Sequence, residues 1–248
     1  MGLLTGKRAF ITGGSRGIGR GLCTIFAREG ASIAFSYVSN DEAAEETKRL
    51  VEAEGQECIA YKTSVTDKHG MIAITRELEA KWGGLDILVN NAAVNKADNF
   101  LTTTEKSWHD IVDTNVHSLY YVTKPIYKMM SKARKGNILN ITSIAAVRSL
   151  PTSVHYATAK AAVIGFTKCL AREAGNFGVN VNAIAAGIYN TDLGNSLPDA
   201  MKVMYEQWCI QKRFGAPEDL AEFAAFMVSD RNKYMTGEVV IIDGGSIV

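Results

Sequence analysis

The stretch TGGSRGIG, residues 12–19, lies between a short apolar segment, residues 8–12, and an amphipathic segment, residues 18–28. The apolar segment has the length and composition of a buried strand, and the amphipathic segment has the 3.6-residue period of a helix. The sequence therefore predicts a strand, a glycine-rich turn and a helix, in that order. Nucleotide-binding α/β folds begin with this arrangement.

The glycines of this turn suit the binding of a phosphate group. Gly13 permits a tight turn, Gly17 lets the backbone approach a pyrophosphate, and Gly19 allows the helix to pack closely on the strand. The spacing is GxxxGxG rather than the common GxGxxG, which leaves a glycine-rich turn without a ligand as the alternative. Its place directly before a helix N-terminus favours a phosphate site. The residues expected to contact a cofactor here are Gly13, Ser15, Arg16, Gly17, Ile18 and Gly19.

Short apolar segments and longer segments of helical period alternate along the rest of the chain. The predicted strands are residues 8–12, 32–36, 57–61, 87–90, 137–141, 180–184 and 239–242. The predicted helices are residues 18–28, 41–54, 69–81, 105–132, 153–174 and 217–228. Strands this apolar, each followed by a helix, predict a parallel sheet covered on both faces. We expect an α/β protein with one doubly wound Rossmann domain over residues 1–248, a seven-stranded parallel sheet and helices on both faces.

Composition restricts the class of protein. The 248 residues are 47% hydrophobic and 21% charged, with a formal net charge of +1, so we expect a globular core and no nucleic-acid surface. No stretch reaches the roughly 18 apolar residues of a membrane span. The four cysteines are widely separated, which is typical of reduced, cytoplasmic proteins. His69, His109 and His117 have no ligand spacing, so no metal is expected.

The end of the second predicted strand bears on the choice of cofactor. NAD-binding sites place an Asp or Glu there, about 20 residues past the turn, on the ribose hydroxyls. This chain has Ser36 near that position, and its next acid, Asp41, is placed to begin the following helix. Arg16 and Ser36 are suited to bind a 2′-phosphate. The sequence therefore predicts NADP(H), with NAD(H) as the alternative.

Tyr156 and Lys160 are four residues apart in a segment of good helix formers, so they share one helix face. An ammonium about 4 Å from a phenol, at an effective dielectric constant near 20, supplies roughly 4 kcal/mol, or about 3 pKa units. Such a pair predicts a tyrosine that acts as a general acid near neutral pH. A lysine that is merely solvated is the alternative.

Ser143 and Asn115 are polar residues at informative positions. Ser143 follows the fifth predicted strand, at the carboxyl edge where such folds bind ligands, although serine at a strand end is often only a loop residue. Asn115 is a poor helix former inside the predicted helix 105–132. Asn115 therefore either has a functional role or is a simple surface amide.

Together these motifs resemble those of the short-chain dehydrogenase/reductase family. The matching stretches, in the family's order over essentially the whole chain, are residues 12–19, Asn90-Asn91-Ala92-Ala93, Asn115, Ser143, Tyr156 with Lys160, and Asp243-Gly244-Gly245. The 13-residue step from Ser143 to Tyr156 is typical of the family. The resemblance implies a Rossmann fold, a nicotinamide cofactor, reduction of a ketone to an alcohol, and a homotetramer.

The resemblance also implies a role for each motif residue. Tyr156 would donate a proton to the carbonyl oxygen, and Lys160 would lower the pKa of that tyrosine and hold the nicotinamide ribose. Ser143 would stabilise the developing negative charge, and Asn115 would position a water linked to Lys160. The further residues implied to contact the cofactor are Asn91, Ser64, Val65, Ile188 and Thr191.

Within the family the sequence looks most like the 3-oxoacyl-[acyl-carrier-protein] reductases, which implies a 3-oxoacyl thioester and an acyl-carrier protein as partner. Those reductases place two arginines beside the site; Arg134 matches one of them, but Phe177 stands at the other. A free small-molecule ketone therefore stays open. An NAD(P)-dependent alcohol, hydroxysteroid or polyol dehydrogenase stays open too. So does a non-catalytic dinucleotide-sensing protein, although such a protein would be expected to have lost Tyr156 or Lys160.

Residues 187–216 form the longest irregular stretch, with a short helix predicted at 200–208. A segment of this length after the sixth strand is typical of a lid over a ligand site, so we expect it to bind substrate. Within it, Tyr189 and Trp208 either line an apolar pocket or pack the lid. His155, next to Tyr156, is interpreted as a loop histidine, with a substrate contact as the alternative.

Overall fold

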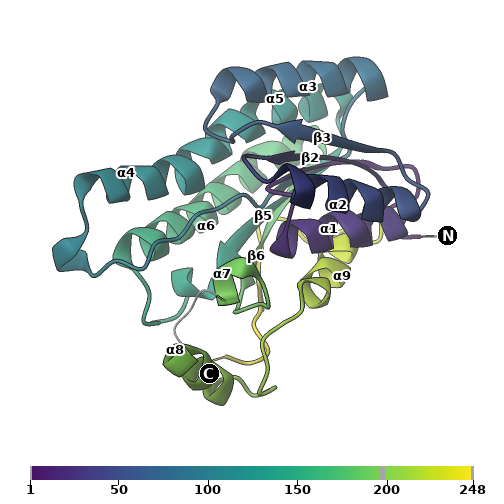
Figure 1. Cartoon of the computed structure of the whole chain (residues 1–248). Coiled ribbons are helices and arrows are strands. Elements are labelled where there is room, and N and C mark those ends of the chain that lie inside the picture. The colour runs from purple at the N-terminus through teal and green to yellow at the C-terminus, as the bar shows by residue number, and fades with distance from the viewer. Residues whose placement is uncertain (1, 196–198, 247–248) are drawn as a thin grey trace.

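The computed structural model describes residues 2–195 and 199–246. Its centre is a seven-stranded sheet in the order β3-β2-β1-β4-β5-β6-β7, in which neighbouring strands are parallel (Figure 1). The strands are β1 (Arg8–Thr12), β2 (Ser32–Tyr37), β3 (Cys58–Lys62), β4 (Ile87–Asn90), β5 (Gly136–Ser143), β6 (Val179–Ala186) and β7 (Val239–Ile242). The predicted sheet is confirmed, and Ser143 ends β5 as expected.

Helices cover both faces of this sheet. They are α1 (Gly17–Arg28), α2 (Asp41–Ala53), α3 (Lys68–Trp82), α4 (Glu105–Val112), α5 (Ser118–Ala133), α6 (Val154–Ala174), α7 (Asp192–Asn195), α8 (Asp199–Trp208) and α9 (Pro217–Met227). One apolar core forms between the sheet and α1, α2 and α9, and another between the sheet and α3, α5 and α6 (Figure 1). In β1, Ile11 enters the first core and Phe10 the second, because successive side chains of a strand point to opposite faces. The predicted doubly wound α/β fold is confirmed.

The predicted helix over residues 105–132 is confirmed, because the chain is helical from Glu105 to Ala133, but it is not α-helical throughout. A π-helical turn, Asp113–His117, separates α4 from α5. In this turn, Asn115 Nδ2 donates hydrogen bonds to the carbonyl of Ile111, 2.8 Å away, and to that of Val94, 2.9 Å away. Because the side chain engages a carbonyl one turn earlier, it competes with the regular α-helical bonding, and the backbone takes the wider π spacing.

The strand order reverses between β1 and β4, and ligands bind such folds at the carboxyl edge beside this reversal. Residues 187–216, called the lid segment below, follow β6 at that edge and carry α7 and α8 (Figure 1). The predicted helix 200–208 is confirmed as α8, whereas residues 196–198 lie outside the described residues. Within the described ranges, no helix is both long and apolar enough to cross a membrane.

Candidate active site

A cavity of about 810 Å³ opens at the carboxyl edge of the sheet. Its walls come from the glycine-rich turn, the ends of the central strands, the first turns of α6 and the lid segment. The predicted site residues in its lining are Gly13, Ser15, Arg16, Gly17, Ile18, Gly19, Ser36, Ser64, Val65, Asn91, Ser143, Tyr156, Lys160, Ile188 and Thr191. Asn115 is outside this lining and is buried. The fold thus brings nearly all of the predicted residues together in one place.

The glycine-rich turn has the backbone geometry that a phosphate group needs. Gly13 and Gly17 have φ angles of +68° and +54°, which residues with a Cβ rarely adopt. A Cβ on Gly19 would lie 2.0 Å from the carbonyl oxygen of Gly13, so only glycine lets α1 pack this closely. Arg16, at the N-cap of α1, makes no capping bond with its side chain, which leaves the first N–H groups for an anion. The turn therefore fits the pyrophosphate of a dinucleotide.

The residues around Ser36 would face the adenosine end of such a dinucleotide. Ser36 ends the buried part of β2, and the lining residues 36–40 include no acid. Asp41 follows them, and its carboxylate lies 2.7 Å from Lys62 Nζ and 3.0 Å from the Tyr37 hydroxyl. The bonds from Lys62 and Tyr37 hold the pKa of Asp41 below its usual range. Asp41 is not among the residues that line the cavity.

Arg16, which was expected at a 2′-phosphate, points to the lid segment in this structure. Its Nη1 lies 2.9 Å from Oδ2 of Asp192 in α7, and both side chains are largely exposed. Exposed ion pairs contribute only about 0.2–1 kcal/mol. Arg16 can therefore exchange Asp192 for a phosphate at little cost.

Ser143, Tyr156 and Lys160 lie in one wall of the cavity. Tyr156 and Lys160 are both almost fully buried, on the same side of α6. Lys160 Nζ donates a 2.9 Å hydrogen bond to the carbonyl of Ile141 in β5, and it lies 5.8 Å from the centre of the Tyr156 ring. The alternative of a solvated Lys160 is therefore wrong.

The predicted fall in the pKa of Tyr156 is wrong for this structure. Burial raises the pKa of Tyr156, and hydrogen bonding to Ser143 lowers it by a smaller amount. Burial also lowers the pKa of Lys160 to about 8. The sequence argument placed an ammonium about 4 Å from the phenol, but Nζ is directed at Ile141 instead. Desolvation therefore dominates for both groups.

Asn115 is 3% exposed, which excludes the surface amide. Its Nδ2 makes the two bonds to Ile111 and Val94, whereas its Oδ1 is buried without a hydrogen-bond partner. An unsatisfied buried oxygen of this kind is a suitable acceptor for an ordered water. This matches the water that the family resemblance implies beside Asn115.

The lid segment contributes aromatic residues to the cavity. Tyr189 is buried, lines the cavity and donates a 2.9 Å hydrogen bond to the carbonyl of Ile242. Trp208 is 42% exposed and packs edge-on against Tyr205 instead of lining the cavity. Sequence reasoning missed Tyr205, which does line it and whose hydroxyl bonds the carbonyl of Pro151. No local pattern marks Tyr205, because only the packing of α8 brings it to the site.

The interpretation of His155 as a loop histidine is wrong. His155 is the second residue of α6, and its side chain is completely buried. It does not line the cavity, so the structure does not support a substrate contact either. It packs instead beside Asp98 and Ser107, which precede and begin α4.

The expectation that Arg134 stands beside the site is wrong within this chain. Arg134 precedes β5, whereas Ser143 ends that strand. An eight-residue strand spans roughly 26 Å, so the two residues lie at opposite edges of the sheet. Arg134 donates to the carbonyl of Asn176, and the neighbouring Phe177 packs edge-on against Tyr127.

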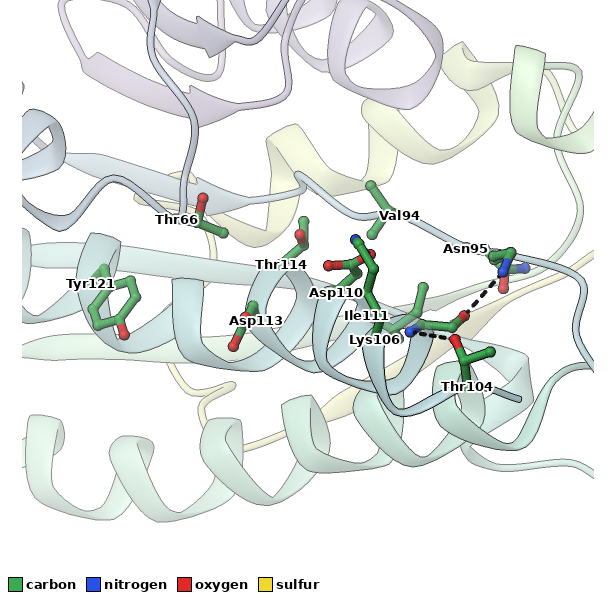
Figure 2. Close-up of a pocket in the computed structure, with 12 residues that line it drawn as sticks. Thr66, Val94, Asn95, Thr104, Lys106, Asp110, Ile111, Asp113, Thr114 and Tyr121 are labelled. Atoms are coloured by element: carbon green, nitrogen blue, oxygen red, sulfur yellow. Dashed lines mark hydrogen bonds and ion pairs between the residues drawn. The ribbon is translucent and has the colours of Figure 1, made fainter. Parts of the chain in front are cut away.

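A second cavity of about 690 Å³ lies next to the first. Figure 2 shows Val94 and Asn95 on one side of it and residues of α4, such as Asp110 and Ile111, on another. Val94, Asn95 and Thr114 line both cavities. The loop between β4 and α4, residues 91–104, therefore separates the two. In the described part of the chain, no group of three or more His, Cys, Asp or Glu is placed to hold a metal ion.

Known proteins resemble this chain over nearly its whole length. The family model described as "Enoyl-(Acyl carrier protein) reductase" matches residues 13–246. The 3-oxoacyl-[acyl-carrier-protein] reductase FabG of Chlamydia trachomatis is 35% identical over 244 residues, which cover 98% of this chain and 98% of that protein. The enzyme of the same name from Staphylococcus epidermidis is 35% identical over 239 residues, 96% of this chain and 98% of that protein.

Solved structures show the same likeness in three dimensions. A putative short-chain alcohol dehydrogenase from Sinorhizobium meliloti has a TM-score of 0.93 at 33% identity, and the match covers 98% of this chain and 97% of the other. A mutant short-chain dehydrogenase/reductase from Serratia marcescens has a TM-score of 0.92 at 31% identity, with 99% of both chains covered.

Proposed function

The chain belongs to the short-chain dehydrogenase/reductase family and is an oxidoreductase, and we propose that it uses NADPH to reduce the ketone of a 3-oxoacyl thioester or a similar carbonyl to an alcohol. The observation that carries the proposal is the convergence of Ser143, Tyr156 and Lys160 with the glycine-rich turn on one cavity. Carbonyl reduction needs a proton donor and a second hydrogen-bond donor beside the dinucleotide. The names of the Chlamydia and Staphylococcus relatives support this substrate class.

The lining of the cavity would hold NADP(H), which supplies the hydride for the carbonyl carbon when it is bound. The backbone of the turn, with Gly13, Ser15, Gly17, Ile18 and Gly19, would bind the pyrophosphate. The other residues proposed to contact the cofactor are Arg16, Ser36, Ser64, Val65, Asn91, Tyr156, Lys160, Ile188 and Thr191.

Tyr156 would donate its phenolic proton to the carbonyl oxygen. Because burial raises its pKa, the phenol is protonated at neutral pH, as a proton donor must be. Ser143 would donate a hydrogen bond to the same oxygen while negative charge develops there, which lowers the barrier.

Lys160 and Asn115 would return the lost proton to Tyr156. With its pKa lowered to about 8, Lys160 can release and regain a proton close to neutral pH. A water held by the unpartnered Oδ1 of Asn115 would connect Lys160 to solvent. Lys160 would also bind the nicotinamide ribose once it leaves the carbonyl of Ile141.

The preference for NADP(H) over NAD(H) is supported by the adenosine end of the cavity. Ser36 and Arg16 would bind a 2′-phosphate, and the stretch 36–40 that lines this end of the cavity has no acid to bind ribose hydroxyls. Fluorescence titration should therefore give a lower Kd for NADPH than for NADH. Equal Kd values would contradict this part of the proposal.

The proposal has three further parts. The partner is an acyl-carrier protein, and the location is cytoplasmic. The chain forms a homotetramer through α4, α5, α6 and the C-terminal segment. The names of the relatives support the carrier protein. Arg134 does not, because it lies at the far edge of the sheet from Ser143. A free thioester or ketone therefore remains an equal candidate for the substrate.

The test is a substrate panel with the purified full chain, followed by NADPH absorbance. We expect turnover of acetoacetyl-CoA and none of crotonyl-CoA, the probe for the enoyl reduction that the description of the family model names. Turnover of crotonyl-CoA alone would replace ketone reduction by double-bond reduction. Faster oxidation of alcohols with NAD⁺ would favour the dehydrogenase alternative, and the absence of any turnover would favour dinucleotide sensing. Parallel assays with acetoacetyl-carrier protein and with cyclic ketones would separate the carrier-bound substrate from a free one.

A further inference from the structure

His155 is a buried polar residue for which the proposed reaction has no direct use. It directly precedes Tyr156 in α6, and its side chain has no exposed surface. Its Nδ1 is buried without a hydrogen-bond partner. Since an unpaired buried polar atom destabilises a fold, an apolar side chain of similar size would suit a purely structural position better. The position therefore calls for an explanation through its other ring nitrogen.

The second nitrogen of His155, Nε2, faces a small cluster of polar side chains. It lies 3.5 Å from Oδ2 of Asp98 and 3.4 Å from Oγ of Ser107. Ser107 donates a 2.5 Å hydrogen bond to Asp98, and Lys96 Nζ lies 3.2 Å from the same carboxylate. The bond from Ser107 and the nearby Lys96 hold the pKa of Asp98 below its usual range, so the carboxylate is charged. His155 thus contacts an ionised group on the loop between β4 and α4.

Further contacts fix this loop, residues 91–104, beside the site. The carbonyl of Val94 accepts the 2.9 Å hydrogen bond from Asn115 in the π-helical turn. The Oδ1 of Asn95 accepts a 3.1 Å hydrogen bond from the hydroxyl of Ser153, which lies immediately before α6. Asn91 and Ala92, at the start of the loop, are bound separately to Thr12 of β1, so the His155 cluster is the anchor of the part that follows Asn95.

The position of the loop matters for the reaction because it forms the wall between the two cavities. Val94 and Asn95 line the cavity that holds Tyr156, and they also line the cavity of Figure 2. A loop that moved toward either cavity would change the space in the cavity that Tyr156 lines. The anchor at His155 lies in the same helical turn as Tyr156, so it connects the wall to the proton donor directly.

We propose that His155 is a positioning residue that ties the β4–α4 loop to the first turn of α6 through Asp98 and Ser107, and thereby sets the place of Asn95 in the wall of the cavity that Tyr156 also lines. The part of the cavity lined by Val94 and Asn95 then depends on His155, whereas Asn91, the cofactor contact proposed in the same loop, is held separately by its bonds to Thr12. This inference rests on the proposed function for its kinetic consequence only.

The kinetic test compares three substitutions of His155 with acetoacetyl-CoA and NADPH. His155→Leu keeps a similar volume and removes both nitrogens. His155→Gln places an amide nitrogen near the position of Nε2, and His155→Asn places one near Nδ1. We expect the KM for acetoacetyl-CoA to rise about tenfold in the Leu and Asn variants and to stay near the wild-type value in the Gln variant. The Kd of NADPH should not change, and kcat should stay within about threefold.

The matched control is His109→Gln. His109 also has a carboxylate neighbour, since its Nε2 lies 3.6 Å from Oε1 of Glu105, but this pair is exposed on α4. The variant should therefore leave KM, kcat and the Kd of NADPH unchanged. A rise of KM in this control equal to that in His155→Leu would show that the effect is not specific to the buried cluster.

A second readout does not require activity. Lys96 is exposed on the loop, so trypsin cleavage after Lys96, mapped by mass spectrometry, reports loosening of the loop. We expect faster cleavage in His155→Leu than in His155→Gln and in the wild type. The His155→Leu substitution also removes the unpaired Nδ1, so the Tm of this variant should be no lower than that of the wild type.

Each outcome decides a different claim. If no ketone or thioester is reduced by the wild type, the proposed function fails and the trypsin assay alone decides on His155. If the wild type is active but KM and cleavage are unchanged in His155→Leu, the positioning role is overturned. Equal losses in the Gln and Leu variants would also overturn it, since the role requires a donor at Nε2.

Discussion

Two tyrosines of this chain are followed four residues later by a lysine, Tyr120 by Lys124 in α5 and Tyr156 by Lys160 in α6. The sequence pattern is the same, but the surroundings are opposite. Tyr120 is half-exposed and accepts a 2.5 Å hydrogen bond from Lys124, which lowers its pKa. Tyr156 is buried in the wall of the cavity, and burial raises its pKa.

The difference between the two pairs teaches that spacing alone does not activate a tyrosine. The exposed pair makes the charge contact that the spacing predicts. In the buried pair, Lys160 donates to the carbonyl of Ile141, and Ser143 is the residue that lowers the pKa of Tyr156. Burial therefore keeps the Tyr156 phenol protonated, which is what the proposed role as proton donor requires.

The largest expected contrast between the two pairs is catalytic. Tyr156→Phe should lower kcat about a thousandfold, because it removes the proton donor, while the Kd of NADPH changes little. Tyr120→Phe, with the same chemical change in the same sequence pattern, should leave kcat unchanged. Steady-state kinetics and NADPH titration of both variants check this. A Tyr156→Phe protein with full biological activity would instead support dinucleotide sensing.

The second contrast concerns the pH dependence of stability. Lys160 has a pKa of about 8 in the folded chain and an ordinary value of 10.5 when unfolded. Between these values the unfolded state binds more protons at this lysine, so Lys160 should contribute a rise in the free energy of unfolding with pH, roughly 3 kcal/mol relative to a variant that lacks it. Urea unfolding of Lys160→Met between pH 7 and about 10.5 should lack this rise. Lys128→Met, at an exposed position of α5, serves as the control and should follow the wild-type curve; a wild-type slope in Lys160→Met would refute the assignment.

The third prediction concerns Ser143, which lowers the pKa of Tyr156 in the buried pair, as Lys124 lowers that of Tyr120 in the exposed pair. Ser143→Ala should lower kcat about a hundredfold, since the developing negative charge loses one donor. It should also raise the pKa of Tyr156 further, because hydrogen bonding to Ser143 lowers that pKa in the wild type. A pH profile of kcat together with the rate at neutral pH tests both parts. An unchanged rate would remove Ser143 from the proposed site.

The smallest expected effect lies at the exposed pair. Lys124→Ala should raise the pKa of Tyr120 toward its ordinary value, because the hydrogen bond from Lys124 is the main cause of the lowering. Tyrosine ring carbon shifts followed by NMR titration measure this directly. A pKa that stays low after the substitution would mean that Lys124 is not the cause, and the comparison between the two pairs would lose its basis.

Local patterns were sufficient for the fold and for the cofactor side of the cavity. The strands and helices follow from hydrophobic period, and the turn at residues 12–19 depends on glycines that act through their own backbone angles. Gly13 and Gly17 therefore have positive φ angles and Gly19 packs closely on Gly13, as the predicted turn requires. Asn115 was found as a poor helix former, although the π-helical turn it creates was not.

Other features could not be predicted because they depend on which segments meet in space. The buried state of His155 requires α4 and the β4–α4 loop to pack on α6, and Tyr205 reaches the cavity only through α8. The separation of Arg134 from Ser143 follows from the direction of β5. A local sequence pattern gives no information on the distance between residues that come from separate segments.

The sequence by itself determined the order of strands and helices, the glycine-rich turn and the set Asn115, Ser143, Tyr156 and Lys160. The tertiary structure alone decided the burial of Tyr156 and Lys160, the partner of the Lys160 ammonium and the anchors of the β4–α4 loop. The physical reason is that backbone conformation and hydrophobic period act over a few neighbouring residues, whereas desolvation and hydrogen bonding depend on the groups that folding brings from distant parts of the chain.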